Sequence, residues 1–177
     1  MSRLRDTAES YGLVSRFLHW LMALLLFWQF AGALLYVGIG DTAVTRFVGG
    51  RHLELGAVLF VLVILRAGWA LINRERRPIR HGLADRAAGF GHALLYGLML
   101  FIPAIALLRQ FGSGKPFSVF GLRVMPGRSE RIAWLEAPAD LLHYWLGFAL
   151  LALALGHASF ALAHRASGKR HLLRRML

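Results

Sequence analysis

Residues 143–157 read HYWLGFALLALALGH, with a histidine at each end of a stretch that is otherwise almost wholly apolar. In an α-helix, these fourteen residue steps rise about 21 Å and bring His143 and His157 to within about 40° of the same face. The two imidazoles are therefore predicted to lie along one side of a helix, near its opposite ends.

The hydrophobic content of the chain predicts a membrane protein. Of its 177 residues 57% are hydrophobic, which is more than one soluble core of this length needs. Residues 17–40, 87–108 and 141–164 contain no Asp, Glu, Lys or Arg, and residues 55–73 contain only Arg66. Each segment can cross a hydrocarbon core of about 30 Å as a helix. We predict an all-α integral membrane protein, a single domain over residues 1–177, with a four-transmembrane-helix bundle at about 13–37, 52–72, 88–109 and 139–164.

The basic residues predict the orientation of this bundle. The formal net charge is +12, and thirteen of the 21 Lys and Arg residues fall in the two termini and the connection after the second predicted helix. Seven fall in the other two connections. Because cytoplasmic connections carry the excess of Lys and Arg, both termini are predicted to be cytoplasmic. Topology accounts for this charge, and no nucleic-acid partner is expected.

Histidine is the candidate metal ligand in the predicted membrane segments. The chain contains no cysteine, which excludes disulfides, thiolate metal sites, iron–sulfur clusters and thioether-attached haem. His19 and His157 are predicted to lie toward the cytoplasmic side, and His52 and His143 toward the outside. Paired imidazoles on facing helices suit haem iron with its two axial positions, whereas tetrahedral zinc requires four close ligands.

Glycines and arginines near these histidines agree with a large flat ligand. Gly56 and Gly147 follow His52 and His143 by four residues and leave the helix surface bare one turn along. Candidates to bind haem propionates are Arg16 and Arg66 on the inside and Arg51 on the outside. Histidines that only hydrogen-bond across helices are the structural alternative.

Five stretches carry a family resemblance over nearly the whole chain. They are SRFLHW with His19, RHLELG with His52, GHALLYGLMLFIP, GSGKPFSVFGLRVMP, and HYWLGFALLALALGH with His143 and His157. Together they resemble the bacterial cytochrome b561 family, in its superoxide oxidase group. The fourteen-residue spacing is shared with cytochrome b subunits of formate dehydrogenases and hydrogenases, so the external stretch GSGKPFSVFGLRVMP discriminates more. The segment GRSERIAWLEAPAD matches no motif of the family.

The resemblance implies a bacterial inner-membrane cytochrome with two haems b, ligated by His19 with His157 on the inner side and by His52 with His143 on the outer side. It implies that superoxide gives electrons at the periplasmic side and that ubiquinone or menaquinone is reduced. His92 and His164, near the cytoplasmic level, are then candidates for quinone contact or proton delivery.

A basic outer rim would attract the superoxide anion, as charge-lined clefts do. This rim consists of Arg46, Arg51, Lys115, Arg123 and Arg128. The external carboxylates Glu130, Glu136 and Asp140 are expected to balance nearby arginines instead of taking part in chemistry.

Two alternatives remain. The chain could be the cytochrome b subunit of a larger dehydrogenase- or hydrogenase-type oxidoreductase, with the basic rim as a docking surface for a periplasmic donor. It could also be a transporter or scaffold with structural histidines.

Overall fold

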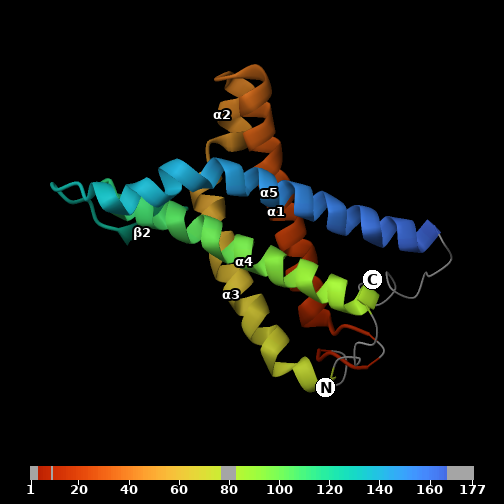
Figure 1. The fold of residues 1–177 in the computed structure, drawn as a ribbon. Coiled ribbons are helices and arrows are strands. Elements are labelled where there is room, and N and C mark those ends of the chain that lie inside the picture. Colours follow the sequence, from red (N-terminus) through yellow and green to blue (C-terminus); the bar gives the residue numbers. More distant parts are fainter. Residues whose placement is uncertain (1–3, 9, 77–82, 167–177) are drawn as a thin grey trace.

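Four long helices form most of the protein, as Figure 1 shows for the computed structural model, which describes residues 4–8, 10–76 and 83–166. The side chains of residues 83–85, 164 and 165 lie outside this description. The long helices are α1 (Leu13–Ile39), α3 (His52–Ile72), α4 (Leu83–Gly112) and α5 (Ala133–Ala166). The connections contain a short helix α2 (Ala43–Gly49), a 3-10 turn η1 (Arg74–Arg76) and the strands β1 (Phe117–Val119) and β2 (Leu122–Met125).

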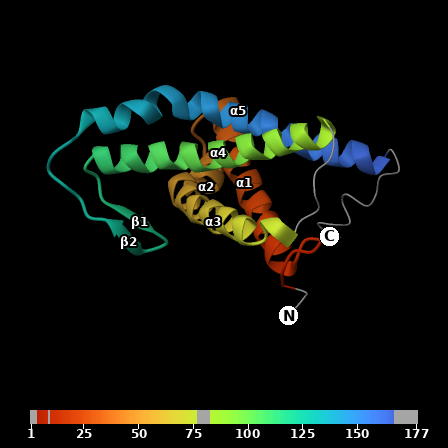
Figure 2. The same cartoon turned by 60° about the horizontal axis from the view of Figure 1, so that its bottom comes forward.

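The long helices associate as two antiparallel pairs. Helix α1 packs along α3, α4 packs along α5, and α3 also contacts α4. In Figures 1 and 2 the α4–α5 pair lies across the α1–α3 pair. Helix α5 therefore passes over both α1 and α3, which is what allows one helix to present side chains to two others.

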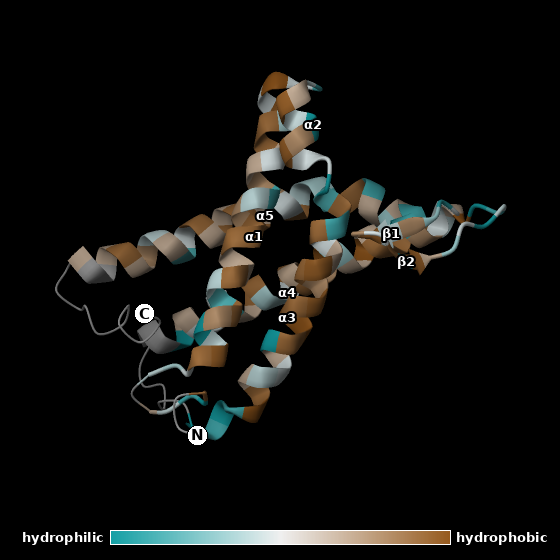
Figure 3. Ribbon diagram, turned by 180° about the vertical axis from the view of Figure 1, so that it is seen from behind, coloured by the Kyte–Doolittle hydropathy of each residue, from teal (hydrophilic) through white to brown (hydrophobic). Residues whose placement is uncertain are grey.

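All four long helices are long and apolar enough to cross a membrane, as predicted. Figure 3 shows hydrophobic residues along much of each of them. Many of their large apolar side chains point away from the protein, among them Phe17, Phe27, Phe90 and Trp145. In water this exposure would be unfavourable, whereas a hydrocarbon phase covers such side chains and leaves the helical backbone bonded internally.

A small hydrophobic cluster lies where α1, α3 and α4 meet. Met22, Leu59 and Val63 are buried there, and Tyr96 and Met99 of α4 pack against them. Met22 follows His19 by three residues on α1, whereas Leu59 follows His52 by seven residues on α3. The cluster thus fills the space between the inner and outer histidines.

The segment before α1 is fastened to the inner end of the α1–α3 pair. Asp6 is buried, and its Oδ1 accepts hydrogen bonds from the amide of Gly12 (2.9 Å) and from the hydroxyl of Ser15 (2.6 Å). Trp69 of α3 donates its indole N–H to the same hydroxyl (3.1 Å). Because Gly12 is the N-cap of α1 and has no cap from its own side chain, Asp6 supplies the missing acceptor.

The predicted bounds agree with α3, whereas the other three long helices are longer than predicted. The sequence predicts 13–37, 88–109 and 139–164, but α1 continues to Ile39, α4 spans Leu83–Gly112 and α5 spans Ala133–Ala166 with Pro138 inside it. Tertiary contacts explain the extra turns at the end of α4 and the start of α5. The amide of Ile132 donates to the carbonyl of Gly112 (2.8 Å), and Arg131, just before α5, pairs with Glu136 in its first turn. Pro138 is the sixth residue of α5 and has no amide to donate to the carbonyl of Trp134, a loss of one bond that a membrane helix tolerates.

The connections are more ordered than predicted. Residues 40–51 contain α2, whose start has a capping box in which the side chains of Thr42 and Thr45 bond reciprocally to backbone amides. The external segment contains the antiparallel β1–β2 hairpin. Its turn places Phe120 and Gly121 at positive φ, which glycine adopts readily and phenylalanine seldom does.

The close contact between the end of α4 and the start of α5 gives a stability prediction. A Cβ on Gly112 would lie 2.8 Å from the Cβ of Leu135 and 3.0 Å from the carbonyl oxygen of Ile132, whereas a Cβ on Gly97 would meet nothing within 4 Å. We expect Gly112→Ala to lower stability by roughly 1–3 kcal/mol through overpacking, a fall in Tm of several degrees. Gly97→Ala is the control and should be neutral or stabilising. Equal Tm values of the two variants in detergent would contradict this packing.

Candidate functional site

The structure brings the four predicted histidines together as two pairs. His19 of α1 faces His157 of α5 with ring centroids 6.3 Å apart, and His52 of α3 faces His143 of α5 with centroids 6.0 Å apart. Each pair joins α5 to a different helix. The separation of the pairs along α5 is the fourteen-residue step found in the sequence.

These separations fit one metal ion held between two imidazoles. A metal-bound imidazole nitrogen lies about 2.0–2.1 Å from the metal with the ring centroid roughly 1.1 Å behind it, so two axial imidazoles place their centroids roughly 6.2–6.4 Å apart. Both pairs agree with this within a few tenths of an ångström. Within the described residues no group of three or more His, Cys, Asp or Glu side chains could hold a metal ion. A metal with two protein ligands therefore needs its other ligands from elsewhere, as a porphyrin provides.

A cavity of about 210 Å³ opens beside the outer pair, lined mainly by apolar side chains of α1, α3, α4 and α5. His52, His143, Gly56 and Gly147 all line it. The Nδ1 atom of His143 is buried and no hydrogen bond of normal geometry reaches it, although the Ile102 carbonyl lies close enough to interact with the ring. A buried polar atom without a hydrogen bond of normal geometry is unfavourable, so this ring is suited to a bound group.

The two glycines of this cavity differ in their surroundings. A Cβ on Gly147 would meet nothing within 4 Å, which agrees with the predicted space for a flat ligand. A Cβ on Gly56 would lie 3.4 Å from Nε2 of Gln29. The bare surface at Gly56 therefore also receives a protein side chain, which was not predicted.

At the inner level a third imidazole joins the pair. His92 of α4 lies with its ring centroid 5.2 Å from that of His157, and its Nδ1 is 2.6 Å from the carbonyl oxygen of Ala88. Since a carbonyl oxygen can only accept, Nδ1 of His92 is the donor in this contact. The side chain of His164, the second predicted quinone or proton residue, lies outside the described part of the chain.

The two predicted inner arginines lie on α1 and α3. Arg16 is half-buried, three residues before His19 on α1. Arg66 donates from Nε to the hydroxyl of Tyr96 (2.9 Å) and acts electrostatically on both His19 and His157. A positive charge is thus held beside the inner pair, where an anionic group of a cofactor would be stabilised.

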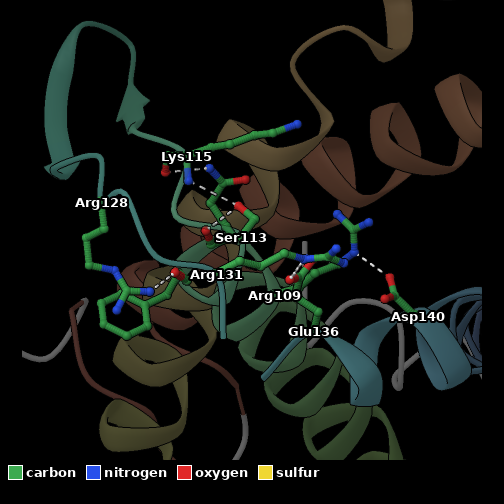
Figure 4. A network of polar contacts seen from close by, with 9 residues as sticks. Arg109, Ser113, Lys115, Arg128, Arg131, Glu136 and Asp140 are labelled. Atoms are coloured by element: carbon green, nitrogen blue, oxygen red, sulfur yellow. Dashed lines mark hydrogen bonds and ion pairs between the residues drawn. The ribbon is translucent and has the colours of Figure 1, made fainter. Parts of the chain in front are cut away.

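The predicted basic rim is partly neutralised. Arg46 pairs with Asp41 (3.1 Å), and Arg51 pairs with Glu54 (2.9 Å) while lying over the ring of Phe120. Two of the five rim residues therefore lie against carboxylates. The expected balancing role is confirmed for two external carboxylates, because Glu136 pairs with Arg131 and Asp140 with Arg109 (Figure 4).

Other rim residues keep exposed positive charge. Arg128 donates to the carbonyl of Phe111 (2.6 Å), a neutral partner, and Lys115 is exposed in the same network (Figure 4). Arg123 is exposed on β2 and makes no ion pair with any residue that the structure describes. The hydrogen bond to Glu136 holds the pKa of the Arg131 guanidinium above its usual range. The outer surface thus remains basic despite its ion pairs.

A membrane protein of four apolar helices with imidazoles paired across them has the design of membrane b-type cytochromes. Comparison with known proteins agrees: residues 10–177 match the model of the prokaryotic cytochrome b561 family. The chain is also 30% identical over 180 residues to cytochrome b561 homolog 2 of Escherichia coli strain K12, covering 97% of this chain and 93% of that protein. The chain belongs to the prokaryotic cytochrome b561 family, as its motifs predicted. Membership implies haem b binding and is in keeping with a role in electron transfer.

The open space at Gly147 gives a prediction for haem content. A leucine at this position would fill the cavity beside His52 and His143, so Gly147→Leu should reduce the haem bound per chain. Gly97→Leu is the matched control, because Gly97 also has open space around it but does not line the cavity. Haem per chain is measured by the pyridine haemochromogen assay. Equal haem contents would show that the cavity does not hold the group.

Proposed function

We propose that the chain is a dihaem membrane cytochrome of the bacterial inner membrane that transfers electrons across the bilayer, oxidising superoxide at the periplasmic side and reducing ubiquinone. Menaquinone is the alternative electron acceptor in this proposal. Both termini and the connection between α3 and α4 are placed in the cytoplasm by the positive-inside bias. The whole chain acts as one domain in this proposal.

The observation that carries the proposal is that α5 contributes one imidazole to each of the two pairs. Helix α5 presents one imidazole to α3 near the outer end and another to α1 near the inner end. Haem b bound at such pairs supplies one-electron transfer. His52 and His143 would hold the outer iron, and His19 and His157 the inner iron. Two stacked sites of this kind would give electrons a path between the two membrane surfaces.

At the inner level the chain has to bind the quinone and allow two protons to reach it. Two superoxide anions give two electrons, which with two protons convert one quinone to quinol and leave two molecules of dioxygen. His92 is suited to contact a quinone because it lies against His157 on the neighbouring helix. His164 is seven residues beyond His157 and is the second candidate. Arg16 and Arg66 are candidates to hold propionates at this level.

At the outer level the basic residues favour an anionic substrate. Guanidinium groups have five N–H donors, so Arg46 and Arg51 retain donors after pairing with one carboxylate each. Both side chains remain more than 60% exposed. Together with Arg123 they would concentrate superoxide near the outer pair.

One set of observations favours a second candidate, a cytochrome b subunit that accepts electrons from a periplasmic protein. Phe120, Leu122 and Val124 are 50–72% exposed in the external hairpin around Arg123, outside the candidate membrane spans. Exposed aromatic and aliphatic side chains next to arginines are typical of protein interfaces.

A spectroscopic experiment tests the proposed function. The purified, oxidised chain is prepared without oxygen and exposed to a flux of superoxide while its visible spectrum is followed. We expect rapid appearance of a reduced b-haem band, which superoxide dismutase abolishes and added ubiquinone discharges. In His52→Ala only the outer haem should be lost, and in His19→Ala only the inner one.

The other outcomes separate the alternatives. A haem spectrum that stays oxidised argues for a subunit that needs a protein donor, and co-purification of a haem or iron–sulfur protein would support that reading. Two haems per chain in His52→Ala would contradict the proposed ligand pairs. A purified chain without any haem band would contradict the whole proposal.

Charge reversal at the rim gives a second prediction. Arg51→Glu and Arg46→Glu should each slow haem reduction by superoxide several-fold, and the difference from the unmodified chain should shrink at high salt, because steering acts through the field at the surface. Arg74→Glu on the cytoplasmic side is the control, since Arg74 is exposed and also neighbours a carboxylate, that of Glu75. Haem content should stay constant in Arg46→Glu and Arg74→Glu, whereas the rate of Arg51→Glu is compared per bound haem, because Arg51 is also a candidate to bind a haem propionate. Equal rates at low ionic strength would remove the steering role.

A further inference from the structure

Gln29 is a polar residue in the uncharged part of α1. Its side chain is 8% exposed, and it lines the cavity beside His52 and His143. A carboxamide buried in a membrane helix is unfavourable unless it forms hydrogen bonds, so its position has to be explained by a partner.

That partner is the backbone of His52. Nε2 of Gln29 donates to the carbonyl oxygen of His52 over 2.8 Å, between α1 and α3. A carbonyl oxygen accepts two hydrogen bonds, so this bond adds to the one that the helix makes with the residue four positions on. That residue is Gly56, and its lack of a Cβ leaves Nε2 of Gln29 room to approach.

His52 differs from the other three paired histidines in its place on the helix. It is the first residue of α3, whereas His19, His143 and His157 lie within α1 and α5. The N-cap of α3, Arg51, has no side-chain hydrogen bond to the free amides of the first turn. Without a side-chain cap, the first turn of α3 is held less firmly than a turn inside a helix, and its first residue carries the ring that faces His143.

We propose that Gln29 is a positioning residue for the outer imidazole pair. By fixing the His52 carbonyl it holds the first turn of α3 and keeps the His52 ring directed at His143. The inference rests on the proposed function, in which His52 is an axial ligand of the outer haem. The inner pair needs no such device, because both of its histidines are held by complete helical turns on either side.

Carbon monoxide binding to the reduced protein tests this role. An iron with two axial imidazoles has no open position for CO, so the unmodified chain should show no spectral change. Gln29→Met keeps the length of the side chain and removes its N–H donors. Loss of a group that hydrogen-bonds to a metal ligand typically weakens metal binding roughly 10–100-fold. In this variant CO should therefore bind to one of the two haems.

Leu26→Met is the matched control. Leu26 lies one turn before Gln29 on α1 and lines the same cavity, and it makes no hydrogen bond to His52. This variant introduces the same new side chain into the same wall, and both of its haems should remain unable to bind CO. The electron paramagnetic resonance signal of the oxidised outer haem should likewise change in Gln29→Met only.

The outcomes distinguish this inference from the function on which it rests. Two haems that both exclude CO in Gln29→Met would overturn the role of Gln29 and leave the proposed function intact. Loss of both haems would also overturn it, because the amide would then support the whole fold instead of His52. An unmodified chain with fewer than two haems, or with a haem that binds CO, would contradict the ligand pairs and this inference together.

Discussion

An imidazole inside a lipid bilayer is unfavourable unless its nitrogens find partners, and this constraint organises the whole protein. Helix α5 contains two such rings in an otherwise apolar span, and each is met by a ring from another helix. The crossing of the α4–α5 pair over the α1–α3 pair follows from this requirement, since α5 has to reach α1 at one level and α3 at the other. Between the two levels the chain needs only apolar packing, which Met22, Leu59 and Val63 provide.

The polar contacts at the ends of the helices set the register of this arrangement. Arg109 at the end of α4 pairs with Asp140 (2.6 Å), three residues before His143 on α5. An exposed ion pair contributes about 0–1 kcal/mol, so it serves to align the two helices more than to stabilise them. At the inner end, Asp6 and Trp69 both bond to Ser15, one turn before His19. The hydrogen bond from Gln29 to His52 lies within the membrane-spanning part, where such bonds contribute roughly 0.6–2 kcal/mol.

The sequence predicted what depends on local pattern and left out what depends on contacts between distant residues. The bounds of α3 were predicted correctly because an apolar run lies between Arg51 and Asn73. Helix α2 could have been found from Thr42 and Thr45, whose spacing is a capping signal in a segment otherwise interpreted as a loop. The early start of α5 depends on Gly112 and Arg131 and has no signal in the segment itself. Gln29 could have been noticed as a lone amide in an apolar helix, but its partner could be identified only from the fold.

Because α5 contributes one member to each imidazole pair, the thirteen residues between His143 and His157 work as a molecular ruler. Apart from Gly147, which lines the cavity beside His52 and His143, their identities can change widely, provided that they remain apolar and helical. Their number cannot change, since one residue added or removed rotates one ring by about 100° and shifts it by about 1.5 Å along the axis. A single deletion would therefore turn one of the two imidazoles away from its partner ring, while the hydropathy of the helix would stay almost unaltered. In this stretch of α5 the number of residues between the two histidines constrains the structure more than the identity of most side chains does.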